Sequence, residues 1–531
     1  MGIAKKSGLS ALAIFLSRIL GLLREQAFAS LFGAGFFSDA FLVAFRIPNL
    51  FRDLFAEGAL SSSFVSVLSK EDSLKKQKDL SNDLFLALFW ILIMVMAVMF
   101  FMAPDFVNLL ASNFKNHIGK FEITLHLTYW LLPTLLFSSL AAFSMGILNT
   151  QGSFFIPSLS PAFFNIGSVL LGASSAFYCL NKGEARLAIV FFAIGTMVGS
   201  FLQWAIQWPS LIKKGFSPLN SIKNLLKYAQ VLKSFKNPKV YKIFILILPA
   251  VLSVAFVQIS IFINTSFASG LEEGSVSWLN YAYRILHFPM GLFGVAISLA
   301  SLPGLSKLSF DPKAFQESLA SSLRMSLILA WGSAMGLIFF GRVIVALIFQ
   351  HGSFDPIDTY ETSQALAAYG VGLIAFNLNK VLLSAYYALE SVLIPSVAAV
   401  FSLVINFYLA KVLSELLGHS GLALCVSIAG ISKLFFMLAF LWKKSFLKMN
   451  YRILGLFLVL IMASLPMLLS HFMGLEDWLF EILRTQGKTC FIPMVLMFLG
   501  VLGISYLVIV SAFTPEGRIL IKKISFFKKS G

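Results

Sequence analysis

The chain of 531 residues is 58% hydrophobic and only 12% charged, with a mean hydropathy of +0.86. No soluble globular core could hide that much apolar surface, so the composition excludes a soluble domain and predicts a polytopic membrane protein. The formal net charge of +17 would suggest a nucleic-acid partner in a soluble protein. Here the lysines gather in the connections and tails, as the positive-inside rule describes, so no nucleic acid is expected.

About 14 apolar windows follow one another along the chain, each of about 20 residues and so long enough to cross a bilayer. Backbone polar groups must be paired inside lipid, and the windows lack the short alternating pattern of an outer-membrane barrel. They therefore predict transmembrane helices and an all-α fold. The windows cover residues 9–33, 36–68, 84–111, 122–148, 157–180, 185–210, 240–268, 277–302, 319–349, 362–388, 393–416, 420–442, 451–473 and 490–512.

Basic residues indicate which connections face the cytoplasm, because cytoplasmic loops carry an excess of Lys and Arg. They concentrate at the N-terminus, in the even-numbered connections, above all in residues 213–239, and in the C-terminal tail at 518–529. The acidic connection with Glu272 and Glu273 is odd-numbered. Both termini are therefore expected in the cytoplasm.

Short segments of the first half recur in the second half at a nearly constant spacing. Two such matches are Ala44-Phe45-Arg46-Ile47 with Ala282-Tyr283-Arg284-Ile285, and Ile156-Pro157-Ser158 with Ile394-Pro395-Ser396. Both matches link positions six spans apart. They predict parallel lobes related by an axis along the membrane normal, with the substrate site between the lobes.

The expected domain organisation follows from this duplication. It comprises an N-terminal lobe of six spans at 1–210, a basic cytoplasmic linker at 211–239, a second six-span lobe at 240–442, and two further spans with a basic cytoplasmic tail at 443–531. The lysines of the linker have two interpretations, because they either set the topology or recognise anionic lipid. The two further spans match neither lobe, which predicts a separate role for them.

Charged side chains interrupt the apolar windows near the N-terminus. Arg18, Arg24, Arg46 and Arg52 all lie in the first two windows, and Arg284 occupies the position that the repeat pairs with Arg46. An intramembrane ionisable group costs about 2.5–3.5 kcal/mol on insertion, so it normally faces an aqueous cavity or a partner. Guanidinium is always protonated, and its planar fork matches phosphate oxygens. The arginines therefore predict a cationic cavity for an anionic cargo.

Polar side chains gather on one side of the second window. At about 100° per residue, an arc of about 140° contains Asp39, Arg46, Asn49, Arg52, Asp53 and Glu57. One interpretation gives this face to the cavity, with Asp39 and Glu57 exchanging partners during gating. The alternative is internal ion pairing, of Arg24 with Glu25 or Asp39 and of Arg52 with Asp53 or Glu57. The surplus of arginine over carboxylate favours an anionic ligand for the set.

The sequence contains no enzyme motif, neither a Walker loop nor GxSxG nor HExxH. Cys179, Cys425 and Cys490 lack the spacing of a metal site or a disulfide framework. No catalytic residue, cofactor or metal is expected, so the protein is predicted to be a transporter rather than an enzyme. Without an ATP site, transport would draw on the membrane potential, an ion gradient or the substrate gradient.

Several motifs resemble those of the MurJ (MviN) family of lipid II flippases. In the first two windows they are Ser17-Arg18-Ile19-Leu20-Gly21-Leu22-Leu23-Arg24, Phe32-Gly33-Ala34-Gly35, Ser38-Asp39-Ala40-Phe41, Arg46-Ile47-Pro48-Asn49-Leu50-Phe51-Arg52 and Phe55-Ala56-Glu57-Gly58-Ala59. In the second half they are Gly274-Ser275-Val276-Ser277-Trp278, Tyr281-Ala282-Tyr283-Arg284 and Phe288-Pro289-Met290-Gly291. The resemblance covers nearly the whole chain and weakens beyond the twelfth span.

The resemblance implies a fourteen-helix transporter of the MOP exporter superfamily. Such a protein flips lipid II, the undecaprenyl-diphosphate-linked glycopeptide, from the inner to the outer leaflet of the bacterial cytoplasmic membrane for peptidoglycan synthesis. The family's substrate-binding cavity arginines match Arg18, Arg24, Arg52 and Arg284. Its acidic cavity positions match Asp39 and Glu57, with Arg46 and Asn49 as further cavity residues. Implied partners are lipid II, membrane lipids and cell-wall synthesis proteins.

The chain departs from the family in two places. Many members carry acids where this chain has Tyr283 and His287, which makes this cavity more cationic. Some members bind sodium through aspartates of spans 7 and 11, but those apolar cores contain no Asp or Glu here, so sodium coupling is not expected. The alternatives are a flippase for another polyprenyl-diphosphate glycan, a drug antiporter, which would need intramembrane acids, and a scaffold for cell-wall enzymes.

Overall fold

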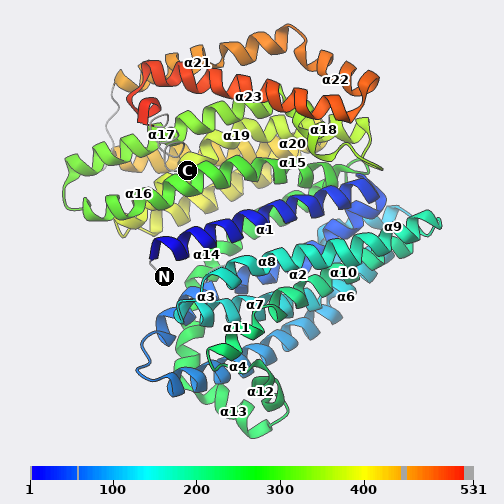
Figure 1. Cartoon of the computed structure of the whole chain (residues 1–531), viewed down its shortest axis with the longest axis vertical. Helices are drawn as coiled ribbons and strands as arrows, with labels where there is room; N and C mark the ends of the chain where they lie inside the picture. The colour runs from blue at the N-terminus through cyan, green and yellow to red at the C-terminus, as the bar shows by residue number, and fades with distance from the viewer. Residues whose placement is uncertain (1–2, 57–58, 444–450, 520–531) are drawn as a thin grey trace. The chain divides into compact units, whose positions relative to one another are not determined.

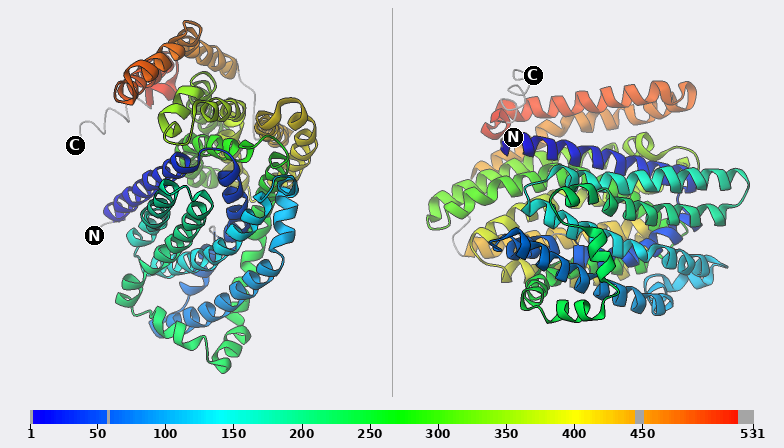
Figure 2. Two further views of the ribbon diagram at one scale, coloured as in Figure 1. Left: turned by 90° about the vertical axis from the view of Figure 1, so that its right-hand side faces the viewer. Right: turned by 60° about the horizontal axis from the view of Figure 1, so that its bottom comes forward.

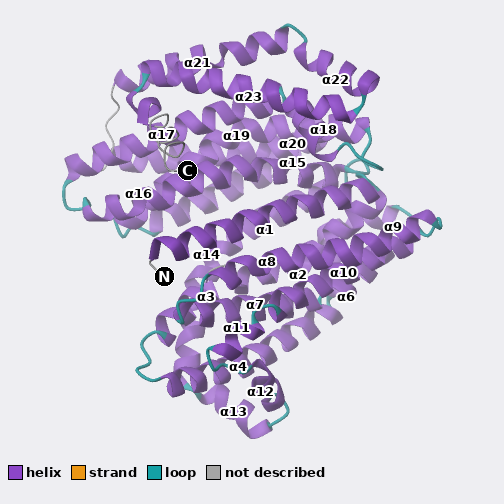
Figure 3. Ribbon diagram, in the orientation of Figure 1, coloured by secondary structure: helices purple, strands orange, loops and turns teal. Residues whose placement is uncertain are grey.

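The computed structural model describes residues 3–56, 59–443 and 451–519 (Figure 1). Within these ranges the regular structure is entirely helical, and no strand is found (Figure 3). Ten helices of this described part are long and apolar enough to cross a membrane. The expectation of an all-α polytopic membrane protein is confirmed, because paired backbone groups inside lipid leave helices as the structure for apolar runs of this length.

The chain divides into two compact units. The first unit contains residues 1–274 and 351–354, and the second contains residues 275–350 and 355–531. The short segment joins the first unit because the Ser353 backbone N–H donates to the Ser30 carbonyl at 2.8 Å.

The first unit holds sixteen helical segments among its described residues. In chain order they are α1 (Ile3–Phe32), α2 (Phe36–Ala56), α3 (Ala59–Leu68), α4 (Leu74–Phe101), α5 (Ala103–Ala111), the 3-10 helix η1 (Ser112–Asn116), α6 (Lys120–Leu131), α7 (Pro133–Thr150), α8 (Phe155–Gly167), the π-helix η2 (Ser168–Ala173), α9 (Ser174–Asn181), α10 (Ala185–Ala205), α11 (Trp208–Lys213), α12 (Pro218–Asn224), α13 (Tyr228–Lys236) and α14 (Pro238–Ala268).

The second unit is built in the same way from long apolar helices. In chain order they are α15 (Ser275–Pro289), the π-helix η3 (Met290–Val295), α16 (Ala296–Lys307), α17 (Pro312–Phe339), α18 (Gly341–Phe349), α19 (Pro356–Ala388), α20 (Leu393–Lys443), α21 (Tyr451–Phe472), α22 (Leu475–Gln486) and α23 (Lys488–Phe513).

The helices follow the apolar windows, with local breaks. The windows 393–416 and 420–442 form the two parts of α20, which meet at Gly418, where φ is 60° and ψ is −139°. This left-handed φ favours glycine, since it has no Cβ. The window 36–68 holds both α2 and α3, with residues 57–58 outside the described part. The amphipathic helix α22 was not among the predicted elements.

Glycines allow α10 to pack closely against α8 and η2. A Cβ on Gly199 would lie 2.4 Å from the Phe164 carbonyl oxygen, and a Cβ on Gly195 would lie 2.3 Å from the Gly172 Cα. The π-turn of η2 contains one residue more per turn than an α-turn, so Gly167 and Gly172 reach the same face although they are five positions apart. Small residues let the backbones of membrane helices approach each other in this way.

The predicted linker contacts the first unit. α13 packs against α4, the Asn237 amide donates to the Asp83 carboxylate at 2.8 Å, and Lys239 forms an ion pair with Glu71. α14 packs against α2, α3, α4 and α5, so the compact first unit extends to residue 274. The predicted boundary between the lobes at residue 240 was drawn from the sequence repeat and not from compactness. The division into two lobes therefore stays a prediction.

In the second unit α19 is the central helix, packed against α15, α16, α17 and α20. The two last long helices, α21 and α23, lie side by side and pack against α17 (Figure 2). Polar contacts fix this packing, because the Tyr506 hydroxyl donates to the Ile328 carbonyl at 2.7 Å and the Trp331 indole donates to the Ser464 hydroxyl at 2.9 Å.

Candidate functional site

The first two predicted arginines lie on α1. Arg18 is exposed and makes no hydrogen bond or ion pair with the residues that the structure describes. Arg24 is mostly buried, forms an ion pair with Glu25, and lies 5.0 Å from the centre of the Phe164 ring. α1 continues without interruption through Gly21, where the missing Cβ leaves room for an asparagine of α8.

Arg52 lies near the end of α2 and is bound by its neighbour in the chain. Its Nε and Nη2 donate to the Asp53 Oδ1 at 3.0 and 2.7 Å. The other carboxylate oxygen of Asp53 accepts a bond of 2.9 Å from the Gln258 amide, which connects α2 to α14. The ion pairs of Arg24 with Glu25 and of Arg52 with Asp53 were the alternative interpretation of these residues, and both are present.

Arg46 lies two turns before Arg52 on α2, which stays helical through Pro48. It lines a small, mainly apolar recess within the first unit. The other lining residues are Ile47, Leu50, Phe106, Leu110, Gln258, Ile261 and Phe262. Asn49 is half-buried, and Glu57 lies outside the described residues.

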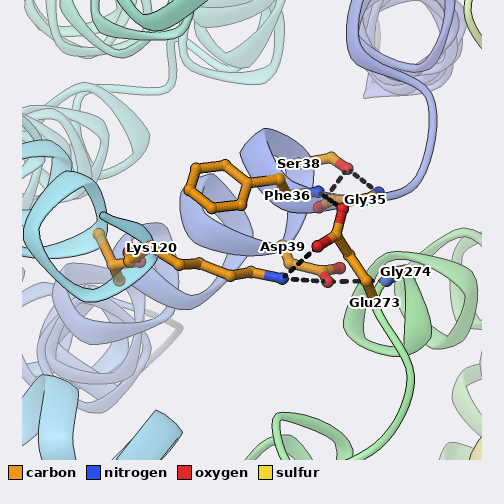
Figure 4. Close-up of polar contacts among 8 residues, drawn as sticks. Gly35, Phe36, Ser38, Asp39, Lys120, Glu273 and Gly274 are labelled. Carbon is orange, nitrogen blue, oxygen red and sulfur yellow. Dashed lines mark hydrogen bonds and ion pairs between the residues drawn. The ribbon is translucent and has the colours of Figure 1, made fainter. Parts of the chain in front are cut away.

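Asp39 lies in a buried cluster at the start of α2 (Figure 4). Its Oδ2 accepts bonds from the Lys120 ammonium at 3.1 Å and from the Gly274 backbone N–H at 2.9 Å. Asp39 and Lys120 are only 2% and 1% exposed. Glu273 completes the cluster, because its Oε1 accepts from the Phe36 backbone N–H at 2.9 Å and its Oε2 lies 4.0 Å from the ammonium.

Sequence reasoning did not identify Lys120. Its ammonium also lies 4.6 Å from the centre of the Phe114 ring, which adds a cation–π contact to the ion pair. Its position provides a usable signal, since it begins α6 in an odd-numbered connection, where basic residues are scarce. A lysine at such a place needs a local partner, and Asp39 is that partner.

Arg284 lies on α15 in the second unit and is exposed. Its neighbours are the two residues at which the chain departs from the family pattern. The centres of the Tyr283 and His287 rings are 4.4 Å apart, and His287 lies about one helical turn after Arg284 on α15. Among the described residues there is no group of three or more His, Cys, Asp or Glu side chains that could hold a metal ion.

Comparisons with known proteins agree over most of the chain. The profile of a family described as "Lipid II flippase MurJ" matches residues 28–498. The "Lipid II flippase MurJ" of Burkholderia cenocepacia is 33% identical over 470 residues, which are 87% of this chain and 89% of that protein. The "Probable lipid II flippase MurJ" of Vibrio cholerae is 34% identical over 441 residues, 80% of each chain.

Solved structures give the same result for the fold. A structure described as "Lipid II flippase MurJ, inward closed conformation" superimposes with a TM-score of 0.74 and 28% identity, covering 97% of this chain and 99% of that chain. An inward-facing multidrug resistance MATE family transporter of the MOP superfamily gives a TM-score of 0.62 at 14% identity, covering 83% of this chain and 95% of that chain. The second likeness concerns the fold alone.

Proposed function

Because this chain belongs to the MurJ family of lipid II flippases, we propose that it moves lipid II from the inner to the outer leaflet of the bacterial cytoplasmic membrane. It is a multi-pass membrane protein, and its relatives are named flippases, which are transporters. The distribution of basic residues supports cytoplasmic positions for both termini.

The observation that supports a diphosphate site is the environment of the Arg18 side chain. An arginine in an apolar helix needs an anion or water, and this one makes no hydrogen bond or ion pair with any described residue. The diphosphate of lipid II supplies oxygens that match a guanidinium fork. Arg18 is therefore assigned to the diphosphate in the proposed mechanism.

Arg24 and Arg52 are assigned to the same anion. Each is bound to the carboxylate of the next residue in its own helix, and the Arg52 side chain keeps 30% of its surface exposed. A diphosphate can replace such a carboxylate when the side chains rotate. Arg284 of the second unit is the fourth proposed ligand. Transport is proposed to proceed by alternating access, for which the duplicated motifs of the two halves are the support.

The test is depletion of this protein in its host, with rescue by plasmid-borne variants. The quantity measured is lipid II accessible at the outer surface of the cytoplasmic membrane. Wild type should restore it, whereas Arg52→Ala and Arg18→Ala should not, although both are present in the membrane. Arg186→Ala is the matched control, since Arg186 is an exposed arginine of α10 that makes no contact described here.

Each outcome decides one part of the proposal. Undiminished lipid II at the outer surface after depletion would contradict lipid II as the cargo and favour another polyprenyl-diphosphate glycan. Full rescue by Arg18→Ala and Arg52→Ala would contradict the arginine site while leaving the cargo intact. A block caused equally by Arg186→Ala would show that loss of any arginine disturbs the fold.

A further inference from the structure

Two lysines lie in membrane-spanning helices of the second unit. Lys380 is on α19 and Lys433 is on the second part of α20, and both are half-buried. Among the described residues, neither ammonium donates a hydrogen bond or forms an ion pair. A cation in a membrane-spanning segment needs a partner or an aqueous cavity, so this pair needs an explanation.

The packing around the lysines holds them in place. The Asn379 amide donates to the Gly430 carbonyl at 2.9 Å, which joins α19 to α20 one turn before Lys433. The Lys380 stem passes close to the π-helix η3, because a Cβ on Gly294 would lie 3.1 Å from the Lys380 Cδ. The Ser298 hydroxyl donates to the Lys380 carbonyl at 2.9 Å. The side chains therefore project from a fixed contact between helices.

No carboxylate comes from the segments of η3, α16 and α20 that contact α19 around Lys380. The sequence contains no Asp or Glu in residues 275–310, 362–389 and 416–443, which cover α15, η3, α16, most of α19 and the second part of α20. α15, which packs against α19, carries a further cation, Arg284. This region of the second unit therefore has surplus positive charge.

We propose that Lys380 and Lys433 form a second anion-binding subsite, which binds carboxylate groups of the peptide part of the cargo. This inference rests on the proposed function, because lipid II carries free carboxylates on its peptide as well as the diphosphate. Lysine suits carboxylates at separate positions, since its ammonium is a compact point charge on a flexible stem, whereas the arginine fork suits phosphate. The subsite would distinguish charged from uncharged peptides.

The test measures binding to the full-length protein in nanodiscs. The three probes are lipid II, lipid II with its peptide carboxylates amidated, and undecaprenyl diphosphate. Wild type should bind lipid II about tenfold more tightly than the amidated form, as expected for charge-assisted hydrogen bonds. The variant with Lys380→Met and Lys433→Met should bind both forms alike and keep wild-type affinity for undecaprenyl diphosphate, which also shows that it is folded.

Two further variants sharpen the test. Lys411→Met is the matched control, since Lys411 is an exposed lysine of the same helix α20, and it should keep the tenfold preference. Lys380→Arg with Lys433→Arg keeps the charge and should keep most of the preference. A double methionine variant that retains the full preference, or that loses all three probes equally, would overturn the subsite. Wild type that binds lipid II without any preference would overturn the subsite alone, and wild type that binds no lipid II would overturn the proposed function as well.

Discussion

Replacing Lys120 by methionine would remove one half of the buried ion pair that joins α6 to α2. Methionine keeps the length of the stem, so the loss is mainly that of the charge. Asp39, only 2% exposed, would keep the Gly274 backbone N–H as a hydrogen-bond donor but lose its counter-ion. Removing one partner of a buried pair typically costs about 3–5 kcal/mol, because the remaining charge is buried and uncompensated.

The assay is unfolding of the purified protein in mixed micelles with increasing SDS, followed by the fluorescence of its tryptophans. Lys115→Met is the matched control, since Lys115 is exposed and makes only a ring contact with Phe121, so its loss should cost less than about 1 kcal/mol. Adding Asp39→Asn to Lys120→Met should recover part of the lost stability, because no unpaired charge then remains.

The reasoning about the buried pair would be refuted by either of two results. One is a Lys120→Met variant as stable as Lys115→Met. The other is a double variant whose destabilisation equals the sum of the two single ones, since independent effects would mean that the two side chains do not interact.

Three further changes have expected outcomes. Gly195→Ala should destabilise the first unit by about 1–3 kcal/mol in the same SDS titration, because its Cβ would overlap the η2 backbone, whereas Gly500→Ala, with open space around it, should not destabilise. Burial raises the pKa of Glu476, so its ionisation in the folded state opposes folding as pH rises above the usual carboxyl range. Glu476→Gln should therefore stabilise the protein at neutral pH, with a gain that disappears when melting is repeated in acid. Tyr506→Phe should cost about 1 kcal/mol by melting, as it loses the bond to the Ile328 carbonyl.

The positions of the helices could be predicted from hydropathy, because lipid requires long apolar segments with paired backbones. The breaks and bends within the helices could not be predicted in this way. Two windows are joined through Gly418 in α20, where a single left-handed residue sets the bend. Helix α22 was not predicted, because it is amphipathic and too short for a membrane window. Its buried face, which includes Leu479 and Ile482, is determined by packing rather than by mean hydropathy.

The site residues were predicted as a set, but their partners depend on tertiary contacts. Helical projection placed Asp39 on one face with the α2 arginines, yet its counter-ion comes from α6. The ion pairs of Arg24 and Arg52 were foreseeable because their carboxylates are adjacent in the chain. The opposite case is Lys120, whose partner is distant in sequence and close only in the fold.

The adjacency of Arg24 to Glu25 and of Arg52 to Asp53 has a consequence for a helix that moves in a membrane. Each arginine carries its own counter-ion on the same rigid body, so translation or rotation of α1 or α2 leaves the local charge balanced. Arg24 and Arg52 therefore keep a counter-ion when the helix that carries them moves. In the proposed mechanism the diphosphate replaces these carboxylates through side-chain rotation, so each of the two arginines stays paired before and after binding.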